Sequence, residues 1–177
     1  MTYRYIKCLT FISTLLWVNA LQAQKDNWRN GILVDEFIYT EAPFPQAHAS
    51  TIAETPDGLI AAWFGGTREG NKDVCIWTSK LVNNKWTAPE KVAEGIINDT
   101  LRYACYNPVL FYASNGELLL FYKIGPNVAG WTGWMMRSKD NGKTWSKREA
   151  LPEGDCARSA CTIGNVKKNW RIAARFR

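Results

Sequence analysis

Short apolar runs with an alternating pattern, separated by polar turns, follow one another along most of the chain. In the first half these runs are ASTIAET, LIAAWFG, DVCIWTSKLV and KWTAPEKV, and Asp57-Gly58 separates the first two. Runs rich in β-branched and aromatic residues indicate strands, and Asp-Gly is a strong signal for a two-residue hairpin turn. Helical spacing is not sustained, because glycine or proline interrupts nearly every candidate segment. The pattern predicts four short antiparallel strands.

The same pattern occurs a second time along the chain. PVLFYA, ELLLFYKI, WTGWMMRS and KTWSKREAL repeat the four runs, with Asn115-Gly116 at the first turn. Alignment of the two copies pairs Gly58 with Gly116 and Trp86 with Trp145. A repeat of four antiparallel strands is the unit of a β-propeller blade. We therefore predict an all-β partial propeller over residues 24–154, with blades at about 40–98 and 99–154.

A polar turn, SKDNGKTWS, connects the third and fourth strands of the predicted second blade. Asp140 and Asn141 can hydrogen-bond to the turn backbone, and Gly142 can adopt a positive φ. Trp145 is expected to begin the fourth strand and to bury its ring. The counterpart in the first blade, KLVNNKWTA, keeps the tryptophan but lacks the Asp-x-Gly sequence. Because the turn recurs once per blade and tolerates change, we interpret it as architecture rather than an active site.

The two ends of the chain differ from the repeats. MTYRYIK, followed by the apolar run CLTFISTLLWVNAL and then QAQ, has the pattern of a secretory signal peptide. We predict removal of residues 1–23, a secreted or periplasmic protein, and no membrane span after cleavage. Residues 155–177 are basic and lack the alternating run that should open a third blade. We expect this tail to be non-native blade sequence, and the chain to be a truncated or frame-shifted product of a longer gene.

Charge and cysteine spacing exclude several classes of function. The formal net charge is +6, and six basic residues from Arg158 onward, with no acid among them, account for the excess. A nucleic-acid groove needs cations spread over a folded surface, so nucleic-acid binding is disfavoured. Cys75 and Cys105 lie in strand-like runs and are expected to be buried, whereas Cys156 and Cys161 are the closest pair for a disulfide. No metal-ligand spacing is present, and we expect no metal or cofactor.

The turn sequence S-x-D-x-G-x-T-W resembles the Asp-box of the sialidase (neuraminidase) superfamily. FPQAHASTIAETPDGLIAAWFGGTREGNKDVCIW and RYACYNPVLF are similar to bacterial sialidase-like proteins with BNR repeats. The resemblance covers about residues 40–154. It implies a six-bladed propeller with its glycan site at one end of the central axis, of which this chain holds about two blades. It also implies a secreted exo-α-sialidase-like glycoside hydrolase for acidic glycans, inactive in this truncated form.

Candidate site residues follow from the place where propellers bind ligands. The axial face is lined by the starts of first strands and by the loops that join second to third strands, and the turn at residues 138–146 falls on the opposite face. Polar residues from distant parts of the sequence are expected to gather at the axial face. They are Gln46, His48, Arg68, Glu69, Asp73, Arg102, Tyr103, Lys123 and Asn127.

The resemblance assigns roles to some of these residues. Sialidase-type catalysis uses three arginines to hold a substrate carboxylate, a Tyr/Glu nucleophile pair, and an aspartate as acid/base. Asp73 best matches the acid/base position, while Arg68 and Arg102 are candidates for carboxylate binding. The family's first arginine lies in a Phe-Arg-Ile-Pro-like segment, and here FPQAH places Pro45 there. That arginine is therefore missing, and the Tyr/Glu pair would lie in blades that this chain lacks.

Several alternatives remain open at this level. His48, the only histidine, is either a proton shuttle in a His-dependent glycosidase or lyase acting on uronic-acid polysaccharides, or a packing residue. Asp73 is either an acid/base residue or a cap for its loop. The two arginines either bind an acidic sugar or pair with Glu69 and Asp99. A non-catalytic glycan-binding propeller is the alternative to an enzyme.

Overall fold

The computed structural model describes residues 34–152. Residues 34–37 belong to one compact unit, and the two sheets lie in a second unit that begins at Ile38. The expected signal peptide, the basic tail and the Cys156/Cys161 pair lie outside the described residues.

The first sheet has five antiparallel strands in the order β1-β2-β3, with two short strands that both pair with β3. Its central strand is the most buried, because both of its faces are covered by apolar side chains. The strands are β1 (Gln46–Thr55), β2 (Gly58–Gly66), β3 (Cys75–Val82), β4 (Lys85–Trp86) and β5 (Glu90–Ala93).

The second sheet has four antiparallel strands in the order β6-β7-β8-β9. A single turn of 3₁₀ helix, η2 (Val128–Gly130), lies in the connection between its second and third strands. The strands are β6 (Ala104–Tyr112), β7 (Leu118–Gly125), β8 (Thr132–Ser138) and β9 (Glu149–Ala150). The predicted all-β fold with four-stranded antiparallel units is thus confirmed.

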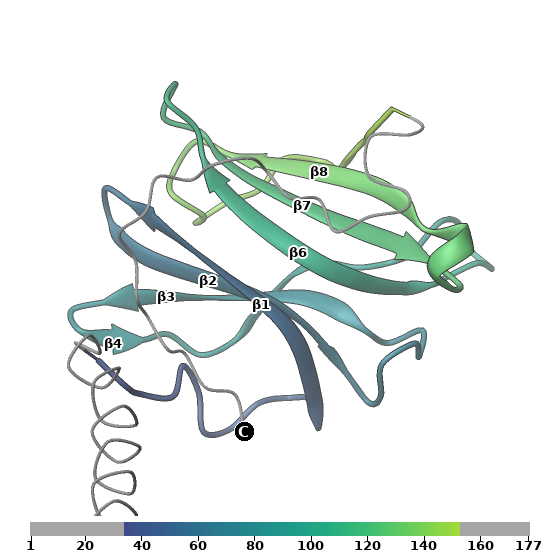
Figure 1. Ribbon diagram of the computed structural model, residues 1–177, viewed down its shortest axis with the longest axis horizontal. Helices are drawn as coiled ribbons and strands as arrows, with labels where there is room; N and C mark the ends of the chain where they lie inside the picture. Colours follow the sequence, from purple (N-terminus) through teal and green to yellow (C-terminus); the bar gives the residue numbers. More distant parts are fainter. Residues whose placement is uncertain (1–33, 153–177) are drawn as a thin grey trace, which may run out of the picture. The chain divides into compact units, whose positions relative to one another are not determined.

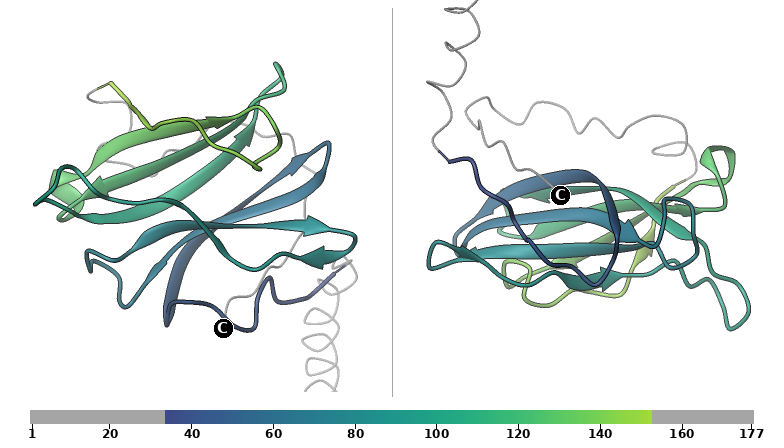
Figure 2. Two further views of the ribbon diagram at one scale, coloured as in Figure 1. Left: turned by 180° about the vertical axis from the view of Figure 1, so that it is seen from behind. Right: turned by 90° about the horizontal axis from the view of Figure 1, so that it is seen from below.

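One hydrophobic core lies between the two sheets (Figures 1 and 2). Alternate residues of β2, namely Ile60, Ala62 and Phe64, face the second sheet and join this core. The intervening Trp63 is fully buried on the other face, where its ring lies 5.1 Å from that of Tyr39. Side chains in a strand point alternately to opposite faces, so the sequence LIAAWFG supplies apolar contacts to both sides. The second sheet contributes Ala104, Cys105, Tyr106, Leu110, Leu118, Leu120, Tyr122, Ile124 and Met136.

The fourth strands are shorter than the sequence predicts. In the first sheet, the expected single run KWTAPEKV is split into β4 and β5 by residues 87–89, which include a proline that cannot donate to a ladder. In the second sheet, only Glu149–Ala150 of KTWSKREAL pairs as a strand. Here the Ser146 hydroxyl replaces a backbone acceptor for the amide of Arg137 (3.0 Å), which interrupts regular pairing. Trp145 therefore precedes the strand and packs, half-buried, against the core.

Both hairpin turns differ from those expected at Asp-Gly and Asn-Gly, the first in its position and the second in its length. In the first blade, Thr55 pairs with Gly58, so the turn consists of residues 56–57 and Gly58 begins β2. In the second, the Ala113 amide donates to the Glu117 carbonyl (2.8 Å) around a three-residue loop. The glycine of each turn has a positive φ, 116° and 85°, which glycine adopts without a steric penalty.

The turn between β8 and β9 is closed by its own side chains. The Ser138 hydroxyl, 1% exposed, donates to Asp140 Oδ1 (2.7 Å) and accepts from the Gly142 amide (2.7 Å). Asp140 also accepts from the Lys143 and Thr144 amides (3.1 and 2.8 Å) and from the Thr144 hydroxyl (2.5 Å). These bonds, that of the Thr144 hydroxyl first, hold the pKa of Asp140 well below its usual range. Gly142 has the predicted positive φ, 83°.

This turn also joins the two sheets. Gly142 is buried against Ile60 of β2, and a Cβ at this position would lie 2.5 Å from the Ile60 Cδ1 atom. Lys80 of β3 donates to the Gly142 carbonyl (3.2 Å), and Lys143 forms an ion pair with Asp57 (2.7 Å) in the β1–β2 turn. The turn of the second blade is therefore a structural contact with the first.

Candidate functional site

The first strands of the two sheets, β1 and β6, share an irregularity at the predicted axial end. Regular pairing of β1 with β2 is interrupted directly after His48, and that of β6 with β7 directly after Tyr106. The next residue of each strand has a positive φ, 53° at Ala49 and 45° at Asn107. A β-bulge bends its strand and redirects the neighbouring side chains. The sequence repeat is thus preserved in the backbone at the point where the candidate site begins.

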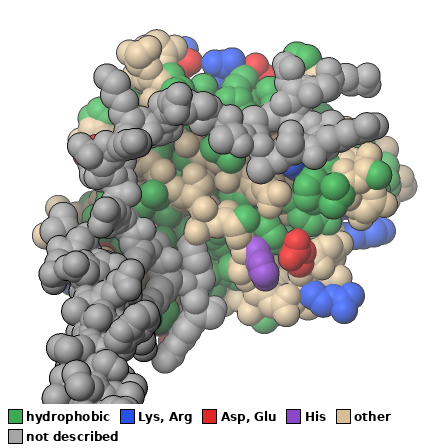
Figure 3. Space-filling model, in the orientation of Figure 1, with side chains coloured by type: hydrophobic (Ala, Val, Ile, Leu, Met, Phe, Trp, Pro, Cys, Tyr) green, Lys and Arg blue, Asp and Glu red, His purple; other side chains and the backbone are tan. Residues whose placement is uncertain are grey.

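His48 lies at the surface beside a carboxylate. Its Nδ1 atom is 4.0 Å from Oε2 of Glu69, and the two side chains are 60% and 52% exposed. The imidazole stacks on the ring of Phe64 with the ring centroids 5.8 Å apart and the planes inclined by 15°. Figure 3 shows the histidine next to an acidic side chain on this face. The structure therefore brings together two of the predicted site residues, one from β1 and one from the β2–β3 loop.

The β2–β3 loop, residues 67–74, is fixed by internal hydrogen bonds. Asp73 Oδ2 accepts from the amide and the hydroxyl of Thr67 (2.8 and 2.5 Å), which closes the loop at its base. The Asn71 amide donates to the Arg68 carbonyl, and the Val74 amide to the Asn71 carbonyl (3.0 Å each). The Thr67 hydroxyl is the main cause that lowers the pKa of Asp73. In this state Asp73 caps the loop and stays ionised, and its acid/base role stays a prediction.

Arg102 connects the loop to the edge of the first sheet. Its Nε donates to the Lys72 carbonyl (2.6 Å), and its Nη2 both donates to the Cys75 sulfur (3.2 Å) and forms an ion pair with Glu94 (3.1 Å). The predicted pairing of Arg102 with Asp99 is wrong. Asp99 lies in a separate exposed turn, whereas Glu94 follows directly after β5. Arg102 braces the backbone of the candidate site.

The remaining predicted residues have different surroundings. Lys123 lies inside β7 rather than in the loop that follows, is 5% exposed, and has its ammonium 4.8 Å from the ring centroid of Trp131. Tyr103 packs partly against the core, and its amide donates to the Gly95 carbonyl (2.9 Å). Gln46 is exposed at the start of β1. Among residues 34–152, neither Gln46 nor Tyr103 forms a hydrogen bond or ion pair with His48 or Glu69.

Arg68 and Asn127 occupy exposed positions in connecting segments. Arg68 follows Thr67 in the closed loop, and within the described residues no ion pair involves its side chain. Asn127 caps η2, its side-chain oxygen accepting from the Gly130 amide (3.1 Å). The exposed guanidinium of Arg68 is therefore available to a ligand, and the Asn127 oxygen already has a donor.

Tyr106 is a site neighbour that the sequence did not single out. Its ring contacts Phe64 (centroids 5.8 Å apart) and Trp131 (4.8 Å), and its hydroxyl lies 3.9 Å from the point where a Cβ on Gly70 would stand. Burial, with the negative charge of Glu69 as a second cause, raises the pKa of Tyr106. The repeat alignment contained the signal, since it pairs this tyrosine with the histidine of the first blade.

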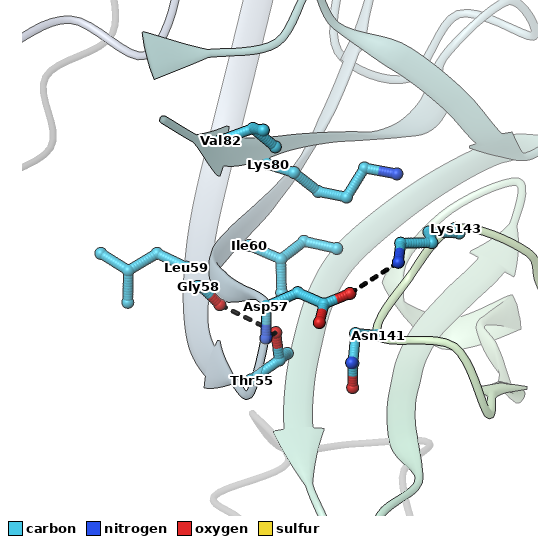
Figure 4. Close-up of a pocket in the computed structure, with 9 residues that line it drawn as sticks. All are labelled: Thr55, Asp57, Gly58, Leu59, Ile60, Lys80, Val82, Asn141 and Lys143. Carbon is cyan, nitrogen blue, oxygen red and sulfur yellow. Dashed lines mark hydrogen bonds and ion pairs between the residues drawn. The ribbon is translucent and has the colours of Figure 1, made fainter. Parts of the chain in front are cut away.

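A hollow of about 160 Å³ lies at the other end of the strands (Figure 4). Its charged groups already have partners, because Lys143 pairs with Asp57 (2.7 Å) and Lys80 donates to the Gly142 carbonyl (3.2 Å). This hollow is a gap at the contact between the blades. Its lining residues are Thr55, Asp57, Gly58, Leu59, Ile60, Lys80, Val82, Asn141 and Lys143.

The described part of the chain lacks two further features. Residues 34–152 contain no group of three or more His, Cys, Asp or Glu side chains arranged to hold a metal ion. Over the same residues, no helix is long and apolar enough to cross a membrane. Cys75 and Cys105 are buried free thiols, as predicted.

Comparison with protein families identifies the repeat. A family model described as "BNR repeat-like domain" matches residues 57–169, more than half of the chain. The chain belongs to the BNR repeat-like family. The match includes β2 to β9 but not β1, and it continues beyond residue 154 into the segment expected to be a non-native tail. That expectation stays a prediction. A comparison with curated protein sequences found no match.

Solved structures show a related fold. The Hadza microbial sialidase Hz136 matches with a TM-score of 0.53 and 14% identity, over 59% of this chain and 25% of the sialidase chain. A protein of unknown function from Dyadobacter fermentans matches with a TM-score of 0.50 and 20% identity, over 66% of this chain and 39% of that one. An α-L-arabinofuranosidase from Lactobacillus brevis has a TM-score of 0.49 and 18% identity, over 62% and 36%.

These comparisons show a sialidase-like fold, of which the described residues form two antiparallel sheets of five and four strands. The chain spans only 25% to 39% of the length of the matched chains. At 14% to 20% identity the likeness concerns the fold, because one propeller fold carries many functions.

Proposed function

We propose that these blades belong to a secreted, sialidase-like glycoside hydrolase that acts on acidic glycans. The supporting observation is the loop of residues 67–74, whose backbone is fixed while the Arg68 side chain stays exposed and the Glu69 carboxylate lies beside His48. A planar guanidinium offers paired donors to a carboxylate, which suits an acidic sugar. Since the chain spans a minor part of the matched structures, the activity is proposed for the complete propeller.

Asp73 is the proposed acid/base residue of this hydrolase. The Thr67 hydroxyl and amide lower its pKa in the free protein, whereas a general acid needs a raised pKa. Proton donation by Asp73 therefore requires that a bound sugar displace these hydrogen bonds and remove the carboxyl group from water. Gln46, Arg102, Tyr103 and Lys123 remain proposed binding residues, with Arg102 acting through the loop backbone that it holds.

A second candidate function is a His48-dependent glycosidase or lyase acting on uronic-acid polysaccharides. The observation in its favour is the pair of His48 and Glu69, in which a carboxylate faces Nδ1 and the imidazole is 60% exposed. A neighbouring carboxylate orients an imidazole, which suits proton transfer to or from a substrate. Asp73 has no role in this alternative beyond closing the loop.

The full-length gene product separates these functions when it is incubated with sialosides and with uronic-acid oligosaccharides. Release of sialic acid that Asp73→Ala abolishes would support the hydrolase, and uronate cleavage lost in His48→Ala would support the alternative. Asp99→Ala, on a different exposed loop, is the matched control and should keep full activity. Binding without release would favour a non-catalytic glycan-binding propeller. The absence of both release and binding would reject the glycan site.

Export is part of the proposal and has its own test. Mass spectrometry of the protein recovered outside the cytoplasm should find Gln24 as the first residue if residues 1–23 are removed. A first residue within that segment would contradict the cleavage. Sequencing the DNA downstream tests the proposed truncation, which fails if no blade-like sequence occurs in any frame.

A further inference from the structure

His48 and Tyr106 occupy the same position in two successive blades. Each is the last regularly paired residue before the bulge in the first strand of its sheet, β1 or β6. Each is followed by a residue of positive φ, 53° at Ala49 and 45° at Asn107. Alanine in the left-handed region costs about 1–2 kcal/mol, and such backbone outliers cluster at functional sites. The repeated bulge thus places one ring of each blade at the axial end, directly before a residue with an unfavourable backbone conformation.

Glu69 belongs to the loop that approaches both rings. Its carboxylate is 4.0 Å from His48 Nδ1. The Tyr106 hydroxyl approaches Gly70, the next residue of the same loop. It lies 3.9 Å from the position that a Cβ atom on Gly70 would occupy. Phe64 contacts both rings at 5.8 Å, stacked on the histidine and edge-on to the tyrosine. The two rings and the carboxylate therefore form one connected group.

We propose that His48, Glu69 and Tyr106 form one acid–base unit of the glycan site, with Tyr106 as proton donor, His48 as proton acceptor and Glu69 positioning both. The use of this unit in catalysis rests on the proposed function. The coupling among the three side chains does not, and it can be measured in the absence of turnover.

The surroundings of Tyr106 decide which form of the phenol is present. Burial and the charge of Glu69 raise its pKa, with a smaller contribution from the Cys105 thiol in the same strand. The other ionisable neighbour is Lys123, which pairs with Tyr106 across β6 and β7. The phenol is therefore protonated at neutral pH. This state suits a proton donor and disfavours a phenolate nucleophile.

The experiment follows the tyrosine and histidine ring signals by NMR in the wild-type protein and three variants. Tyr106→Phe identifies the Tyr106 signal among the seven tyrosines, and the single histidine of the chain gives an unambiguous probe. Glu69→Gln is exposed and isosteric, so the fold should persist. Glu54→Gln, an exposed change at the other end of β1, is the matched control.

We expect Glu69→Gln to lower the pKa of Tyr106, because it removes a negative charge that opposes ionisation. The histidine ring signals should move in both Glu69→Gln and Tyr106→Phe and stay in place in Glu54→Gln. An unchanged Tyr106 titration in Glu69→Gln, or histidine signals unaffected by both changes, would overturn the unit. Glycan release with unchanged titrations rejects the unit alone, whereas coupled titrations without release from any glycan reject the proposed function alone.

Discussion

Replacement of Ala49 by glycine should stabilise the protein, against the usual effect of glycine in a strand. Ala49 has a φ of 53° in the β1 bulge and an exposed side chain, so removal of its methyl group sacrifices little buried surface. An L-residue in the left-handed region costs about 1–2 kcal/mol, because its Cβ approaches the following carbonyl oxygen. Glycine escapes this cost but loses about 0.5–1 kcal/mol more in conformational entropy on folding.

The midpoints of these two ranges differ by about 0.75 kcal/mol, which is the expected net gain in the free energy of unfolding. Ala47 provides the matched control, since it lies two residues earlier in the same strand and pairs regularly with Gly65. Ala47→Gly should lower the free energy of unfolding by about 0.5–1 kcal/mol. The two identical substitutions are thus expected to have opposite signs.

Urea denaturation of the wild type and both variants, followed by tryptophan fluorescence, gives the required free energies from midpoints and slopes. A higher midpoint for Ala49→Gly and a lower one for Ala47→Gly, at equal slopes, would support the reasoning. Equal losses in both variants would refute it, because they would mean that the bulge imposes no strain at Ala49.

Four further results are expected. Ser138→Ala should lower the free energy of unfolding by about 1–3 kcal/mol in urea denaturation, because a buried backbone amide loses its acceptor. Asp140→Asn should be less stable than wild type at neutral pH, and the gap should narrow below a pH of about 4, measured by denaturation over a pH series. The lowered pKa of Asp140 gives a contribution that is complete above the ordinary carboxyl pKa and is lost as the pH falls through the folded value. Arg102→Lys should cost about 1–3 kcal/mol, since an ammonium cannot replace all three contacts of the guanidinium. Cys75 and Cys105 should resist alkylation until the protein unfolds, because burial raises the pKa of both thiols; peptide mass spectrometry would reveal early labelling if this is wrong.

The features that were predictable from the sequence depend on local pattern. The apolar runs LIAAWFG and ELLLFYKI predict strands, which the structure has as β2 and β7, and the repeat predicts two antiparallel sheets. The hydrogen-bonded turn at Ser138 and Asp140 was also predictable, because the side chains that close it lie within four residues of each other.

The features that the sequence did not predict depend on contacts between distant residues. Nothing local to Ala49 indicates a positive φ, since alanine has no preference for it; the bulge is visible only in the pairing of β1 with β2. Glu94 is selected as the partner of Arg102 by the path of the chain after β5. Lys123 was expected at the loop that joins the second and third strands, but it packs inside β7 with its ammonium over an aromatic ring.

The contact of Gly142 with the first sheet explains why the two copies of the turn differ in sequence. Gly142 is buried against Ile60 of the other blade, so both its backbone conformation and its lack of a side chain are required there. Asn83 and Asn84, in the equivalent turn of the first blade, also have positive φ values, 51° and 59°, but are exposed. Asparagine satisfies the backbone requirement alone. Glycine at this turn therefore indicates that another blade packs on it. In a longer array, a turn without this glycine would indicate a blade whose outer turn is open to solvent.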